Sequence, residues 1–110
     1  MNAPSRADGT SSADAPAVPG GTVERVLEIC NKKGLHARAS AKFVMIVERY
    51  DAEVTVTRGN ETVGGTSIMG LMMLAAGPGT KIAVKATGPQ ARECVNALTD
   101  LIACRFTEED

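Results

Sequence analysis

A chain of 110 residues, of which 44% are apolar, is long enough for one small globular domain. Its formal net charge of −1 provides no positive field for a polyanion, and its two Phe, one Tyr and no Trp offer little for base stacking, so we expect no nucleic-acid partner. The longest apolar run, residues 68–77, is about half of the roughly 20 residues that a membrane-spanning helix needs, so we expect no membrane partner either.

The chain divides by composition after residue 21. Residues 1–21 are rich in Ala, Pro, Ser, Gly and Asp, and they contain only two large aliphatic side chains. Such a segment cannot bury enough apolar surface to offset the entropy of ordering, so we predict a disordered tail over 1–21 and one domain over 22–107. Aliphatic side chains and methionine are expected to fill the core of that domain.

The first half of the domain reads as strand, helix and hairpin. The residues "VERVLEIC" from Val23 onward alternate closely enough for a half-buried strand. A helix is predicted over 37–49, and its apolar face comprises Ala37, Ser40, Ala41, Val44 and Val47. Two strands joined by a Gly59-Asn60 turn follow.

The second half continues with helix, strand and helix. Ser67 can cap a short apolar helix, in which Leu71 and Leu74 are expected to be core residues, and Gly77-Pro78-Gly79 has the residues of a type II turn. A strand over 80–87 and a last helix opened by Gly88-Pro89 complete the order βαββαβα. We therefore predict an α+β fold, an open-faced two-layer sandwich in which three helices cover one face of a four-stranded antiparallel sheet.

The segment "KKGLHARASAKF" contains the only histidine, His36, immediately before the predicted helix. The free N–H groups at a helix start attract anions, and a neutral imidazole can attack phosphorus. Arg38, expected to be exposed, adds a planar guanidinium that can bind two phosphoryl oxygens, and Gly34 allows the loop to turn. On spacing alone, a solvated surface histidine or plain helix cap without chemistry is the favoured alternative.

The segments "GLHARASAKF" and "GTSIMGLMMLAAGPG", in this order and at this separation, resemble the HPr family of histidine phosphocarriers of the bacterial phosphotransferase system, including its nitrogen-related branch. The resemblance runs from about Val23 to Phe106. It implies that His36 accepts a phosphoryl group on Nδ1 from enzyme I, which obtains it from phosphoenolpyruvate, and passes it to a histidine of an EIIA protein. It also implies that Arg38 binds the phosphate.

The same resemblance places a regulatory serine at Ser67, the target of HPr kinase/phosphorylase in many bacteria. An added phosphate there would change the charge of a docking surface without refolding the domain. Ile68, Met69 and Met72 are expected to form that surface beside His36, because so short a helix cannot bury every apolar side chain. A plain capping role for the serine and a core role for the three apolar residues stay open on the sequence pattern alone.

Two departures from the family pattern bear on the pathway. Some sugar-pathway members have lysines where this chain has Met45 and Glu48, and the loss of positive charge should change which acidic partner docks fastest. This favours a regulatory branch over sugar delivery. Many members also have Pro where this chain has Ala39, a change that a helix start tolerates.

The remaining expectations concern cofactors, partners and location. The three cysteines have no CxxC spacing, and the single histidine has no Cys or Asp cluster beside it, so neither a metal site nor a cofactor is predicted. Reduced thiols favour the cytoplasm, and we expect a monomer. Two alternatives remain open: an α+β effector-binding module that never becomes phosphorylated on histidine, and a docking regulator that acts only through Ser67.

Overall fold

The computed structural model describes residues 21–107. Its elements are β1 (Thr22–Glu28), α1 (Ala37–Glu48), β2 (Glu53–Arg58), β3 (Glu61–Gly64), α2 (Ile68–Met73), β4 (Lys81–Thr87), α3 (Ala91–Ala103) and a terminal 3-10 turn, η1 (Arg105–Thr107). This confirms the predicted order of strands and helices. The tail predicted over 1–21 lies outside the described residues, except for Gly21.

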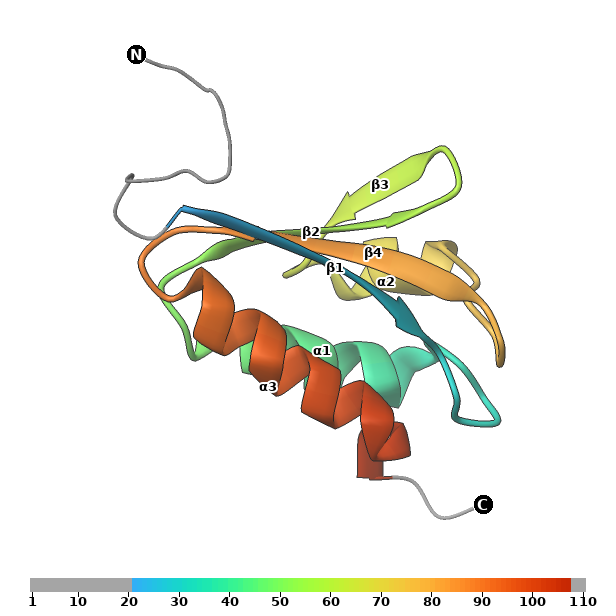
Figure 1. Cartoon of the computed structure of the whole chain (residues 1–110). Helices are drawn as coiled ribbons and strands as arrows, with labels where there is room; N and C mark the ends of the chain where they lie inside the picture. The colour runs from blue at the N-terminus through green and yellow to red at the C-terminus, as the bar shows by residue number, and fades with distance from the viewer. Residues whose placement is uncertain (1–20, 108–110) are drawn as a thin grey trace.

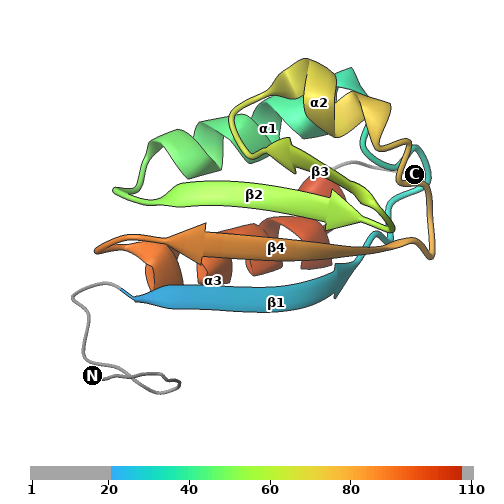
Figure 2. The same ribbon diagram turned by 90° about the horizontal axis from the view of Figure 1, so that it is seen from above.

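The four strands form one antiparallel sheet in the order β1-β4-β2-β3, as Figure 2 shows. Strand β4 pairs on both sides, so that Val84 lies opposite Arg25 of β1 and Val56 of β2. Helices α1 and α3 cover one face of the sheet, and α2 lies beside α1 and β3 (Figure 1). The architecture is the predicted open-faced α+β sandwich.

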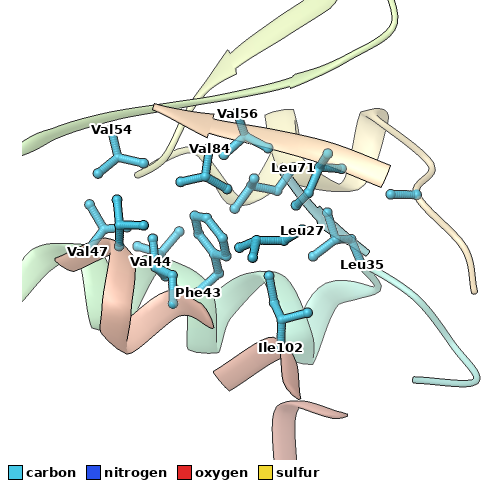
Figure 3. Close-up of a cluster of buried hydrophobic side chains, with 14 of the residues drawn as sticks. Leu27, Leu35, Phe43, Val44, Val47, Val54, Val56, Leu71, Val84 and Ile102 are labelled. Atoms are coloured by element: carbon cyan, nitrogen blue, oxygen red, sulfur yellow. The ribbon is translucent and has the colours of Figure 1, made fainter. Parts of the chain in front are cut away.

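The core lies between the sheet and the helices (Figure 3). The labelled sheet residues meet side chains from all three helices: Val54, Val56 and Val84 from the strands, Phe43, Val44 and Val47 from α1, Leu71 from α2 and Ile102 from α3. Aliphatic residues fill most of this space, as expected. The methionines do not, because those at 45, 69, 72 and 73 are exposed.

The predicted apolar face of α1 is wrong at its first residue. Ala37 is exposed, and it is the first residue of the helix, where only the turn that follows can pack beside it. Ala39 and Phe43 are fully buried instead. The helix also ends at Glu48, one residue before the predicted end, and Arg49 caps it through its backbone N–H.

The chain after α3 turns in a way that the sequence did not indicate. Arg105, Phe106 and Thr107 all have positive φ, between 57° and 59°. Each such non-glycine residue costs roughly 1 kcal/mol. The turn is held because the Phe106 ring is fully buried and because Lys42 Nζ donates to the Phe106 carbonyl and the Thr107 hydroxyl, both at 2.6 Å.

Candidate functional site

The loop between β1 and α1 is fixed on both sides. The Gly34 N–H donates to Asn31 O at 3.3 Å, and Asn31 Nδ2 donates to Gly34 O at 2.9 Å. The Leu35 N–H donates to Ala76 O at 3.0 Å, which ties the loop to the segment after α2. Gly34 has φ +64°, so the turn needs a residue without a Cβ, as predicted.

Close packing is a second reason for glycine at position 34, which the sequence pattern did not reveal. A Cβ placed there would lie 2.2 Å from Ala76 O and 2.8 Å from Gly77 Cα. Both of these are backbone atoms, which cannot swing aside as a flexible side chain can. Gly34 therefore sets how closely the loop approaches the end of α2.

His36 is the N-cap residue of α1, with extended backbone angles of φ −77° and ψ −178°. Its Nδ1 accepts a hydrogen bond from the Arg38 backbone N–H at 3.2 Å, and the residue is half-buried. A ring nitrogen that accepts such a bond carries no hydrogen, so a neutral ring holds its proton on Nε2. Nδ1 thus presents its lone pair to the Arg38 amide, one of the N–H groups at the helix start that have no intrahelical partner.

The structure brings His36 and Arg38 together through the backbone. The contact is made by the Arg38 amide, while the Arg38 side chain is exposed, as predicted. The sequence predicted free N–H groups at the helix start beside His36, but it did not single out the Arg38 amide as the donor to the ring. The signal was available, because a side chain at the N-cap normally accepts from the backbone N–H two or three residues further on.

Ser67 is the N-cap residue of α2. Its Oγ accepts from the Gly70 N–H at 2.9 Å, and the residue is exposed. A Cβ at position 70 would lie 2.9 Å from Ser67 Oγ and 3.0 Å from Val63 Cβ, so glycine leaves room for the cap. The capping role is confirmed, and the hydroxyl is open to solvent.

Helix α2 presents four apolar side chains to solvent, which we call the methionine patch: Ile68, Met69, Met72 and Met73. Met69 and Met73 are 69% and 71% exposed, whereas Leu71 and Leu74 are buried as predicted. Met73 was missed, although helical spacing indicates it, since it follows Met69 by four residues. Helix α2 neighbours α1, and the segment after α2 is bonded to the loop before His36.

The cysteines are the remaining candidate nucleophiles. All three cysteines are free; Cys94 is fully buried on α3, and burial raises the pKa of its thiol. Residues 21–107 contain no group of three or more His, Cys, Asp or Glu side chains that could hold a metal ion. Over the same residues, no helix is long and apolar enough to cross a membrane.

Comparison with known proteins decides the family. A family model described as "PTS HPr component phosphorylation site" matches residues 23–103. The chain belongs to the HPr family. This confirms the resemblance seen in the sequence, and it makes the chain a phosphocarrier of the phosphotransferase system, a role in which a histidine carries the phosphoryl group.

Individual relatives agree with this assignment. The chain is 49% identical over 86 residues to the phosphocarrier protein HPr of Neisseria meningitidis serogroup A, which covers 78% of this chain and 97% of that protein. It is 37% identical over 86 residues to the phosphocarrier protein NPr of Shewanella violacea, covering 78% and 94%. HPr family membership implies contact with enzymes of the phosphotransferase system in general.

A solved structure supports the fold independently. The crystal structure of HPr-C-His from Thermoanaerobacter tengcongensis matches this chain with a TM-score of 0.76 and 39% identity. The match covers 80% of this chain and 99% of that one. The predicted HPr-like sandwich is therefore confirmed.

Proposed function

We propose that His36 accepts a phosphoryl group on Nδ1 from phosphorylated enzyme I and passes it to a histidine of an EIIA protein. The observation that carries this proposal is the position of Nδ1, a lone-pair nitrogen 3.2 Å from the Arg38 amide at the start of α1. His36 is also the single histidine of the chain. No other residue can supply the phosphohistidine of an HPr-type carrier.

The transfer requires little covalent machinery. The Nδ1 lone pair attacks phosphorus in line, while the bond to the donor histidine breaks and leaves its electron pair on the donor ring. The Arg38 amide, no longer bound to the lone pair, can then donate to a phosphoryl oxygen together with neighbouring amides at the helix start. The exposed Arg38 guanidinium supplies further donors and positive charge. Passage to the acceptor is the reverse step with a new histidine.

The methionine patch is the proposed docking surface for enzyme I and for the EIIA acceptor. Unbranched methionine side chains adapt to partners of different shape. Met45, 56% exposed on α1, and Glu48, also exposed, replace the lysines of some sugar-pathway members. An apolar and an acidic residue there slow the approach of acidic partners, which supports a regulatory branch over sugar delivery.

Ser67 is the proposed regulatory site, phosphorylated by a kinase of the HPr kinase/phosphorylase type. Its hydroxyl is exposed, and the helix start tolerates added negative charge. The charge would sit beside Ile68 and Met69, where a partner must remove water to dock. Phosphorylation then weakens docking while the fold stays intact.

The proposal also covers the cellular location, the oligomeric state and the class of partner. We place it in the cytoplasm as a monomeric domain over 22–107 whose partners are proteins, with neither nucleic acid nor membrane among them. The three free thiols suit a reducing compartment. The net charge of −1 supports protein partners over polyanions.

The test is phosphorylation by enzyme I and phosphoenolpyruvate, followed by intact-mass measurement. We expect the addition of one phosphoryl group that is lost in mild acid, absent in His36→Ala and retained in Ser67→Ala. A purified EIIA protein should then remove it. A label that survives His36→Ala, or no label on a folded wild-type chain, would favour an effector-binding or docking role without a histidine relay.

A further inference from the structure

Arg58, the last residue of β2, reaches the carboxyl end of α2. Its Nη1 donates to Leu74 O at 2.8 Å and to Ala75 O at 3.4 Å. The last carbonyls of a helix lack intrahelical donors and carry the negative end of the helix dipole. A guanidinium is well suited to bind them, so Arg58 joins the sheet to the end of α2.

The segment that Arg58 binds has an unfavourable backbone. Ala75 has φ 54°, in the left-handed region that non-glycine residues rarely adopt. The next residue, Ala76, is 1% exposed, and its carbonyl accepts from the Leu35 N–H at 3.0 Å. The bonds from Arg58 oppose the tendency of this turn to relax.

The same carbonyl determines where the His36 loop lies. Gly34 packs so closely on Ala76 O that a Cβ would approach it to 2.2 Å. Leu35, bonded to that oxygen, directly precedes His36. A shift of Ala76 therefore moves Leu35, and with it the backbone that carries the His36 imidazole.

We propose that Arg58 is a positioning residue for phosphoryl transfer, which holds residues 74–76 in place so that the Ala76 carbonyl fixes Leu35 and the His36 ring. This inference rests on the proposed function of His36. The bonds of Arg58 go to the carbonyls of Leu74 and Ala75, so its proposed action on the ring passes through the loop. A small displacement of a reacting nitrogen costs rate even when the fold is intact.

Two readouts test the proposal in Arg58→Ala, Arg58→Lys and the control Arg92→Ala. Arg92 is exposed on α3, so its replacement removes the same charge without touching the loop. The first readout is amide hydrogen exchange at Leu35 relative to Val84 in the central strand. The second is the initial rate of phosphorylation by enzyme I and phosphoenolpyruvate.

In Arg58→Ala we expect Leu35 to exchange faster while Val84 is unchanged. Phosphorylation should slow by about threefold to tenfold, the scale of one net hydrogen bond. Arg58→Lys should recover part of both effects, because an ammonium can also donate to carbonyls. Arg92→Ala should match the wild type.

Three results would overturn the inference: exchange at Leu35 that rises only in step with Val84, slower transfer without faster exchange at Leu35, or faster exchange without slower transfer. If Arg58→Ala does not fold, Arg58→Lys and Arg58→Gln are compared by the same readouts. If the wild type takes no label, the proposed function of His36 fails. Exchange at Leu35 then still decides whether Arg58 holds the loop.

Discussion

Replacement of Gly34 by alanine tests the close contact between the His36 loop and the end of α2. A Cβ in this left-handed conformation costs roughly 1 kcal/mol by itself. The same Cβ would lie 2.2 Å from Ala76 O, so the backbone must separate and the bond from the Leu35 N–H is lost. That bond contributes about 1 kcal/mol, and the displaced packing adds to this. We expect a total loss of about 2–3 kcal/mol of unfolding free energy.

Gly59→Ala is the matched control. Gly59 has φ +60°, close to that of Gly34, but a Cβ there has nothing within 4 Å. Gly59→Ala should therefore lose only the conformational cost, about 1 kcal/mol of unfolding free energy. This corresponds to a fall in Tm of roughly 4–8 °C for a domain of this size. Gly34→Ala should lower Tm by roughly 10–20 °C.

The assay is thermal and urea unfolding of both variants followed by circular dichroism, with phosphorylation of the folded fraction measured alongside. Gly34→Ala should also lose phosphoryl transfer, because the loop that carries His36 moves, whereas Gly59→Ala should keep it. Equal destabilisation of the two variants would refute the reasoning, since it would mean that the contact with Ala76 adds nothing.

Arg38→Ala should slow phosphorylation by about tenfold or more with little loss of stability, because its guanidinium is exposed; equal losses of rate and stability would argue against phosphate binding. Ser67→Asp should keep the helix cap yet weaken docking with enzyme I, which would appear as a raised KM at matched stability. An unchanged KM would argue against a regulatory role for Ser67. Phe106→Ala should cost about 3–5 kcal/mol in urea unfolding, and a cost below about 1 kcal/mol would show that the terminal turn is not anchored. Cys94 should resist alkylation until the chain unfolds. Because burial raises the pKa of its thiol, the thiol ionises at lower pH in the unfolded chain than in the folded one, so ionisation favours unfolding as the pH rises. The free energy of unfolding should therefore fall less steeply at alkaline pH in Cys94→Ala than in the wild type.

Local patterns predicted most of the fold. The sequence Gly77-Pro78-Gly79 forms the expected turn, with the Thr80 N–H donating to Gly77 O at 3.1 Å and Gly79 at φ +84°. The Gly59-Asn60 hairpin also forms, with Arg58 opposite Glu61. These features depend on two to four consecutive residues, so the sequence contains all that determines them.

The features that were missed depend on contacts between distant segments. No local rule places Phe106 in a left-handed turn, because its burial and its bond from Lys42 join residues 64 positions apart. The bond from Arg58 to the end of α2 is likewise a product of tertiary packing. At the candidate site, the pattern singled out His36, Arg38 and Gly34, whose roles in transfer stay predictions, but it did not reveal the bond between Leu35 and the Ala76 carbonyl.

The most direct test of the central claim is the identification of the phosphorylated ring nitrogen by nitrogen–phosphorus NMR on the protein labelled with enzyme I and phosphoenolpyruvate. We predict phosphorus on Nδ1 of His36 and a large shift of the Arg38 amide resonance, because that amide exchanges the lone pair for a phosphoryl oxygen. Phosphorus on Nε2, or an Arg38 amide that does not respond, would contradict the account.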